Sequence, residues 1–303
     1  FLCLRKLEGV QKQNRFPGAP ETARYRYVGE LIGERNFVTQ GGGIAKTGKK
    51  ILKWIVGLGF STSSKPSELQ RPQGVTVDAK GRIYVTDVSR QAVFVFDPVA
   101  GQLRVWQWAL EDKRFVSPIG IAVAADGTVL VADADLHRIV RLTPAGKPAG
   151  DFTEHALGRP TGLAIDPASG RVYVADTAAH HIDVFDASGR YLQTIGGPGV
   201  GPGQFTRPTY LYISGDHLYV SDTLNSRIQV LDLDGKVQHT FGRNGIFMGD
   251  TPRPKGVAVD KDGNVYVVES YYDYLLVFNA QGKLLLPIGG TGNTVGRFYL
   301  PAG

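Results

Sequence analysis

The chain has 303 residues, of which 42% are hydrophobic and 20% are charged, as is typical of a globular protein. Its 39 glycines and 17 prolines favour an all-β protein with many turns. The net charge of +6 comes from residues 1–60, which hold eleven Lys or Arg and four Glu, whereas the remaining 243 residues hold 23 basic and 24 acidic side chains. Because the larger part of the chain is close to neutral, nucleic acid is not an expected partner.

The basic segment 1–60 is predicted to be an N-terminal extension, followed by a repeat domain over residues 61–303. Cys3 is the only cysteine, so this sequence offers no intramolecular disulfide and no CxxC metal site. Cys3 is a candidate lipidation site of the bacterial lipoprotein type, although Leu2 is larger than the residue expected before such a cysteine; the alternative is an incidental cysteine. Membrane contact is expected only through that anchor or the basic segment.

Three local features are expected within the extension. Residues 24–32 alternate as a strand does, and residues of about 48–58 place Ile51 and Trp54 on one face of a short helix. Residues 43–49 follow the spacing of a phosphate-binding loop. However, Lys50 stands where that loop requires Ser or Thr, and no βαβ unit surrounds it, so we interpret the segment as a flexible basic loop.

From residue 71 onward, proline-centred segments recur at intervals of 46, 42, 48, 46 and 47 residues. The prolines are Pro72, Pro118, Pro160, Pro208, Pro254 and Pro301. In the third unit, residues 163–166, 171–176, 181–186 and 191–195 form four strand-like runs separated by turns. Four antiparallel strands in each period are typical of a β-propeller blade.

An acidic residue closes the second strand of every complete unit. These residues are Asp87, Asp133, Asp176, Asp222 and Glu269. A carboxylate at this point can accept hydrogen bonds from backbone N–H groups of the following turn. In two units it can also meet the basic residue that opens the third strand, Arg138 or Arg227. Five copies in five units indicate a structural role rather than a catalytic one.

The repeated patterns x-Pro-x-Gly-Val-x-Val-Asp, Gly-x-x-Tyr-Val-x-Asp and Arg-Ile-x-Val-x-Asp resemble the NHL repeat family, most closely at residues 221–228 and 263–267. The resemblance implies a six-bladed β-propeller, with bacterial exported relatives. The fourth unit departs from the pattern, because Tyr210 stands where other units have glycine and its first turn is shortened at Ser214-Gly215.

Five blades are complete in the sequence, and the sixth is represented only by residues 300–303. We expect the strand at 24–32 to close the last blade. An unclosed ring would expose two sheet edges, so we also expect about 40 further residues after Gly303 to supply the remaining strands.

The resemblance implies that an enzyme of this kind would hold a metal in the central channel. A peptidyl-amidoglycolate lyase would need histidines there, but the residues after the six prolines are Gln73, Ile119, Thr161, Thr209, Lys255 and Ala302. A lactonase-type cluster of Glu, Asn and Asp cannot be placed either. His137 and His180 occupy equivalent turns of adjacent blades, too far apart to share a metal, and His180 and His181 would point to opposite faces of a strand. We therefore predict no catalytic residue, no metal site and no cofactor.

Binding of a partner protein is better supported than metal-dependent catalysis. The turns between second and third strands share one face of a propeller with the linkers between blades, so their side chains can form one binding surface. The residues predicted to bind the partner there are Arg90, His137, His180, Asn225, Tyr271, Tyr272 and Tyr274. The favoured function is a non-catalytic protein-binding scaffold in the periplasm, at the cell surface or outside the cell. A multihaem cytochrome is the partner that the resemblance implies. The alternative is a metal-dependent lyase or lactone hydrolase.

Overall fold

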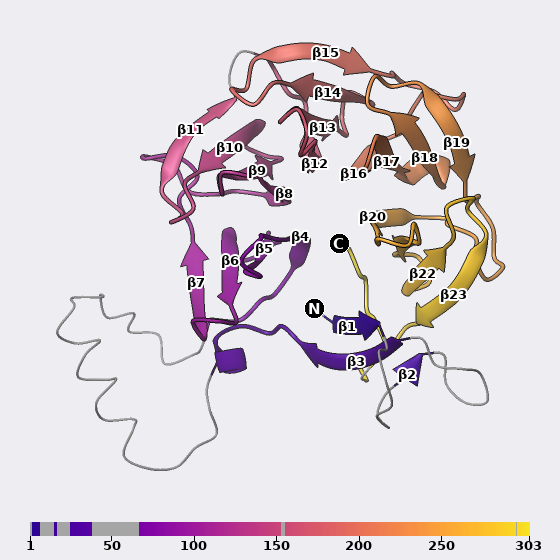
Figure 1. Ribbon diagram of the computed structural model, residues 1–303, viewed down its shortest axis with the longest axis horizontal. Coiled ribbons are helices and arrows are strands. Elements are labelled where there is room, and N and C mark those ends of the chain that lie inside the picture. Colours follow the sequence, from indigo (N-terminus) through magenta and orange to yellow (C-terminus); the bar gives the residue numbers. More distant parts are fainter. Residues whose placement is uncertain (1, 7–14, 17–24, 38–66, 153–154, 295) are drawn as a thin grey trace.

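The computed structural model describes residues 2–6, 15–16, 25–37, 67–152, 155–294 and 296–303. Five four-stranded sheets and one three-stranded sheet stand around a ring, and the strands of each four-stranded sheet follow one another outward from the centre (Figure 1). Within each four-stranded sheet, every strand pairs antiparallel with the strand next to it in the sequence. These sheets are the five blades predicted from the repeat.

The blades follow the repeat in chain order. The first contains β4 (Pro72–Val77), β5 (Ile83–Asp87), β6 (Ala92–Asp97) and β7 (Gln102–Trp106), and the second β8 (Pro118–Val123), β9 (Val129–Asp133), β10 (Arg138–Leu142) and β11 (Pro148–Phe152). The third contains β12 (Pro160–Ile165), β13 (Val172–Asp176), β14 (His181–Phe185) and β15 (Tyr191–Ile195). The fourth contains β16 (Pro208–Ser214), β17 (His217–Asp222), β18 (Arg227–Asp232) and β19 (Val237–Phe241), with the 3-10 helix η2 (Thr223–Asn225) between its second and third strands. The fifth contains β20 (Pro254–Val259), β21 (Val265–Glu269), β22 (Tyr274–Phe278) and β23 (Leu284–Gly289).

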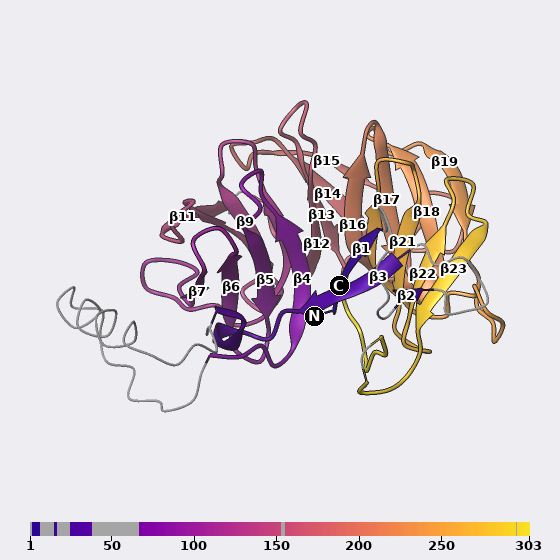
Figure 2. The same cartoon turned by 60° about the horizontal axis from the view of Figure 1, so that its bottom comes forward.

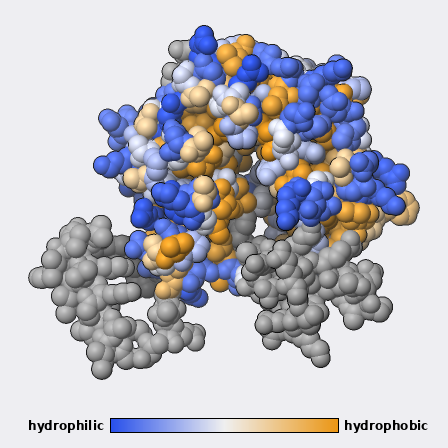
Figure 3. Space-filling view, in the orientation of Figure 1, coloured by the Kyte–Doolittle hydropathy of each residue, from blue (hydrophilic) through white to orange (hydrophobic). Residues whose placement is uncertain are grey.

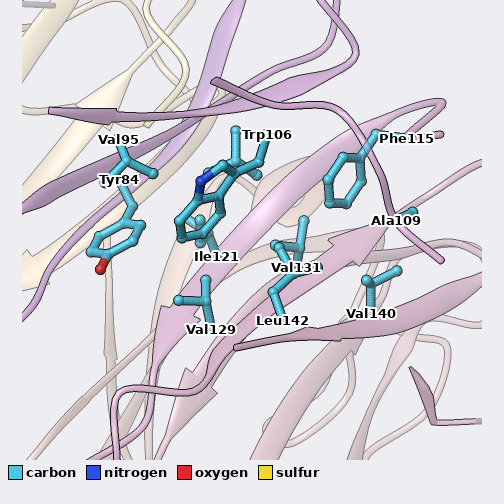
Figure 4. Close-up of a cluster of buried hydrophobic side chains, with 11 residues drawn as sticks. Tyr84, Val95, Trp106, Ala109, Phe115, Ile121, Val129, Val131, Val140 and Leu142 are labelled. Atoms are coloured by element: carbon cyan, nitrogen blue, oxygen red, sulfur yellow. The ribbon is translucent and has the colours of Figure 1, made fainter. Parts of the chain in front are cut away.

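The hydrophobic core lies between neighbouring blades rather than inside any one of them. Figure 4 shows one such cluster, in which Tyr84 and Trp106 of the first blade meet Val131 and Leu142 of the second. The rings of Tyr84 and Trp106 are 5.7 Å apart. Because both faces of a blade are covered in this way, the middle strands read as apolar runs, and β13 is buried at all five positions.

Glycines of the Pro-x-Gly pattern let the innermost strands approach each other. A Cβ at Gly74 would lie 2.4 Å from the carbonyl oxygen of Ile119 in the next blade, and one at Gly120 would lie 2.0 Å from that of Thr161. Side chains at these positions would push neighbouring blades apart. The glycine of the repeat is therefore a requirement of ring packing.

The N-terminal strands occupy the gap between the fifth and first blades (Figures 1 and 2). They are β1 (Leu2–Lys6), β2 (Arg15–Phe16) and β3 (Tyr25–Glu30), in the spatial order β1-β3-β2. On one side, the hydroxyl of Tyr25 forms a 2.8 Å hydrogen bond with that of Tyr266 in β21. On the other, Leu31 and Phe37 pack against the apolar cluster of the first blade, and Leu69 N–H donates to Ile32 O.

The chain after β3 forms a short 3-10 helix, η1 (Glu34–Phe37), at the rim of the first blade. At the other end of the chain, Gly256 N–H donates to Ala302 O, and Gly303 lies against the backbone of Gln73. Residues 302–303 therefore run along the innermost position between β20 and β4. The sequence led us to expect one N-terminal strand at 24–32 in this gap, with the remaining strands supplied by residues after Gly303. The structure places three N-terminal strands there. The helix and the basic loop expected at 43–58 lie outside the described residues.

Candidate functional site

The central channel is crossed by a side chain that breaks the repeat. Tyr210, which replaces the usual glycine on β16 of the fourth blade, donates from its hydroxyl to the carbonyl of Gln73 on β4, 3.4 Å away. Its ring also lies against Gly303. Burial raises the pKa of the Tyr210 phenol, which keeps it neutral and able to donate.

The innermost strands β4, β8, β12, β16 and β20 contain no histidine, aspartate or glutamate. Lys255 is the one charged residue among these five strands, and burial together with the charges of Arg253 and Arg71 lowers its pKa. The Thr161 hydroxyl donates to Thr209 O, which links the third blade to the fourth. The Thr209 hydroxyl bonds to that of Thr223, and Thr223 donates to Pro254 O of the fifth blade. These strands therefore offer no set of ligands of the usual metal-binding types.

One face of the ring carries the turns between second and third strands together with the linkers between blades; we call it the linker-and-turn face. The turns are residues 88–91, 134–137, 177–180, 223–226 and 270–273, and the described linkers are residues 107–117, 155–159, 196–207, 242–253, 290–294 and 296–300. On the face seen in Figure 3, hydrophobic residues gather toward the middle of the ring and hydrophilic residues cover its outer edge.

The five repeated carboxylates join each turn to the preceding linker. Asp176, for example, accepts backbone hydrogen bonds from Gly158 and Arg159 in the linker and from Ala178 and Ala179 in the turn. The structural role predicted for these residues agrees with this geometry. Of the two basic contacts predicted, Arg227 donates to Asp222 at 2.8 Å, but Arg138 is paired with Asp151 instead of Asp133, so that expectation was wrong.

Three of the residues predicted to bind a partner also tie turns to linkers. His137 shares a 2.6 Å hydrogen bond with Gly158 O, His180 Nδ1 accepts from Arg207 N–H, and Asn225 donates to Gly199 O. His137 and His180 end their turns with φ of 58° and 63°, a conformation in which histidine is enriched. The structure thus places them on the predicted face but spreads them over different blades.

The remaining predicted residues lie on the same face. Arg90 is exposed and donates to Glu68 O. Tyr271 is 59% exposed and stands edge-on to Tyr272, and the Arg253 guanidinium lies 6.0 Å from the centre of its ring. Tyr274 opens β22 and packs beside the core cluster of the fourth and fifth blades, as a strand residue would.

A run of exposed apolar side chains on this face was not anticipated from the sequence. Its members are Leu224, Ile246, Phe247, Met248, Tyr271, Tyr299 and Leu300 in turns or linkers of the fourth and fifth blades, with Val200 in the linker that enters the fourth blade. The linker between the first and second blades exposes Trp108 and Val116 on the same face. The linker holding Ile246, Phe247 and Met248 is anchored by Asp250, which accepts from Phe247 N–H and pairs with Arg243. These bonds lower the pKa of Asp250 and keep its carboxylate charged. The only sequence signal was the consecutive Ile246-Phe247-Met248 inside a linker.

A second unanticipated feature is an ionisable cluster on the third blade. Asp183, in the middle of β14, is fully buried; its Oδ2 lies 3.1 Å from His181 Nε2 and 3.4 Å from His155 Nε2. Its Oδ1 accepts from the Thr194 hydroxyl. Burial acts to raise the pKa of Asp183, but the hydrogen bonds from His181 and Thr194 outweigh it and lower that pKa. The hydrogen bond to Asp183 raises the pKa of His181.

Strand pairing shows how unusual Asp183 is. The residues that occupy its position in the other blades are Phe94, Val140, Gln229 and Leu276. A carboxylate therefore replaces an apolar or neutral residue in the third blade. A single polar residue at an otherwise buried strand position was the available signal, but nothing in the sequence pattern linked it to His155.

Cys3 lies in β1, opposite Gly29 of β3, and its lipidation stays a prediction. In the part of the chain that the structure describes, no helix has the length and apolar character needed to cross a membrane.

The ring of four-stranded antiparallel sheets defines this chain as a β-propeller protein. Residues 69–96 match the family described as NHL repeat, and residues 163–244 match the family described as 6-bladed beta-propeller. Together with the fold, these matches confirm the predicted resemblance to the NHL repeat family within a β-propeller chain.

Among curated proteins, a gluconolactonase of Zymomonas mobilis is 29% identical over 170 residues, which cover 47% of this chain and 47% of that protein. Human NHL repeat-containing protein 3 is 26% identical over 157 residues, covering 48% of this chain and 43% of that protein. The chain thus matches about half the length of these relatives. A virginiamycin B lyase structure from Staphylococcus aureus has the same fold, with a TM-score of 0.58 and 17% identity over 75% of this chain and 72% of that one.

Proposed function

We propose that this propeller is a non-catalytic scaffold that binds a partner protein on the linker-and-turn face. The observation that carries the proposal is the run of exposed apolar side chains on the fourth and fifth blades, from Val200 to Leu300. Apolar side chains gathered on one face of a folded protein are typical of a surface that another protein covers.

The charges around these side chains specify the partner further. Arg253 lies over the ring of Tyr271, and the Arg243 side chain, paired with Asp250, is 73% exposed. Tyrosine and arginine are enriched where interfaces bind most strongly. The partner that fits is a protein with an apolar patch bordered by acidic groups. The envelope location and the multihaem cytochrome partner implied by the family resemblance are part of this proposal.

The test begins with identification of a protein that copurifies with the chain, followed by a binding titration between the two purified proteins. Replacing Ile246 and Phe247 by serine should weaken binding at least about tenfold, because such residues form the centre of an interface. The matched control is Val99→Ser: Val99 is 89% exposed but lies in the β6–β7 hairpin, on the opposite face. Equal affinity of both variants for the partner would reject the proposed surface.

The second candidate is a metal-dependent lactone hydrolase or lyase, favoured by the sequence similarity to a gluconolactonase. The side chain of Tyr210 across the channel and the lack of His, Asp or Glu on the five inner strands weigh against a site there. Assays of sugar lactones with Ca²⁺, Mn²⁺ or Zn²⁺ separate the two candidates. Metal-dependent turnover that is unchanged in the Ile246 and Phe247 variant would support the enzyme and count against the scaffold.

A further inference from the structure

The third blade buries more negative charge than its neighbours can neutralise by ordinary ion pairs. Asp176 and Asp183 both lie at 1% exposure or less. Among the described residues, neither forms an ion pair with lysine or arginine; the ion-pair partners of Asp183 are His155 and His181. Buried charges in proteins are paired or coordinate metals. Asp176 is satisfied by backbone N–H groups, as in the other blades, so the unexplained charge is that of Asp183.

The geometry around Asp183 is that of a ligand cluster. One ligand atom each from Asp176, His181 and Asp183 lies within 4.8 Å of those of the other two. Ligand atoms about 2.0–2.2 Å from a tetrahedral zinc ion lie roughly 3.3–3.6 Å from one another. The separations of 3.1 Å and 3.4 Å between Asp183 Oδ2 and the two imidazole nitrogens are close to that spacing.

Hydrogen bonds and ring contacts from neighbouring residues orient Asp183 and His155, as residues around a metal site orient its ligands. The Thr194 hydroxyl donates to Asp183 Oδ1 at 2.7 Å, which directs Oδ2 toward the two histidines. The imidazole of His155 stacks on the ring of Tyr191, with centroids 4.1 Å apart and 9° between planes. His155 and His181 remain partly exposed, at 30% and 22%, so an ion can enter from solvent.

We propose that Asp176, His181 and Asp183, with His155 beside them, bind one divalent transition-metal ion of the zinc class. Imidazole nitrogen and carboxylate oxygen are ligands that zinc accepts, and three such groups leave a coordination position for water. The site lies between the second and third blades on the linker-and-turn face, away from the central channel. It joins β13 to β14 beside the linker that carries His155, and it does not depend on the proposed scaffold function.

The test is a calorimetric titration of Zn²⁺ into the full chain after removal of metal with a chelator. We expect one equivalent to bind, and Asp183→Asn and His181→Gln each to weaken binding at least about tenfold. The matched control is His217→Gln, which removes a 42% exposed histidine from β17 of the fourth blade and should leave the affinity unchanged. Co²⁺ should bind at the same site and show visible absorption that both ligand variants lose.

Thermal unfolding provides an independent readout, because an ion that binds only the folded protein raises its melting temperature. Zn²⁺ should raise the melting temperature of the wild type and of His217→Gln, but not of His181→Gln. If Asp183→Asn does not fold, the partly exposed His181 variant decides the question. Absence of Zn²⁺ binding by the wild type, or equal binding by His181→Gln and wild type, would overturn the proposal.

Discussion

The third and fourth blades use the same two positions on their third strands in different ways. His181 and Asp183 on β14 stand opposite Asp176 and Val174, just as Arg227 and Gln229 on β18 stand opposite Asp222 and Val220. In the fourth blade, Arg227 pairs with Asp222 and donates to the carbonyls of Val200, Gly201 and Gln204. Gln229 completes the arrangement by accepting from Gly203 N–H and donating to Gln204 O.

The two blades differ in the charges that they place at these positions, although their backbone pairing is the same. The fourth blade places one permanent positive charge against one buried carboxylate and fastens the preceding linker by direct hydrogen bonds. The third blade places a second carboxylate where the fourth has a neutral amide, and surrounds it with two histidines. Because the backbone pairing is the same in both blades, propeller construction does not explain the extra charge of the third.

The largest effect is expected from Arg227→Met in the fourth blade. This change leaves Asp222 buried without its cation and removes several bonds to the linker, so we expect a loss of about 3 kcal/mol in the free energy of unfolding. The matched change His181→Gln in the third blade, measured without metal, should cost no more than about 1 kcal/mol. Urea titrations of both variants measure these losses; equal losses would mean that both blades are fastened in the same way.

A second comparison concerns the first hairpins of the two blades. In the third blade, Asp166 accepts from Ala168 N–H and from the N–H and hydroxyl of Ser169. Burial acts to raise the pKa of Asp166, but the hydrogen bonds from Ser169 and Ala168 outweigh it and hold the pKa below 3.8. In the fourth blade the corresponding turn is shorter, between Ser214 and His217, and its Asp216 is 88% exposed.

Asp166→Asn should therefore lower the free energy of unfolding by about 1 kcal/mol at pH 7. A carboxylate whose pKa is lower in the folded than in the unfolded protein stabilises the fold above the unfolded value, and this stabilisation is lost as pH falls through the folded value. The difference between wild type and variant should thus shrink as pH falls below about 4. Asp216→Asn is the control with almost no effect, and a pH-independent difference for Asp166→Asn would contradict the assignment.

The third blade can also be rebuilt with the residues of the fourth. The double variant His181→Arg, Asp183→Gln should fold, and without metal its stability should lie within about 1 kcal/mol of the wild type, because it replaces a buried charge by a neutral amide. Zn²⁺ should no longer raise its melting temperature. If this variant still binds Zn²⁺, the metal site needs neither His181 nor Asp183 and the proposed ligands are wrong.

The sequence predicted the blades well because their structural requirements recur: the carboxylate at the end of the second strand occurs in all five blades, and the inner glycine in four of them. It could not predict features that occur once. Tyr210 contacts Gln73, 137 positions away, and His155 meets Asp183 from a linker whose path no alternation pattern describes. The three-stranded N-terminal sheet was missed for the same reason, since β1 and β2 share no motif with the blades.

The smallest effect on stability is expected at the linker that leaves the fourth blade. This linker exposes Ile246, Phe247 and Met248. The linker that leaves the third blade exposes only Val200 among its large apolar residues. Since Phe247 is 69% exposed and Asp250 holds the linker backbone, Ile246→Ser with Phe247→Ser should change the free energy of unfolding by less than about 0.5 kcal/mol. Asp250→Ala, which removes the anchor, should cost about 1 kcal/mol or more. A urea titration in which the serine variant lost more than the Asp250 variant would mean that these apolar side chains stabilise the propeller itself, and they would then no longer support a binding surface.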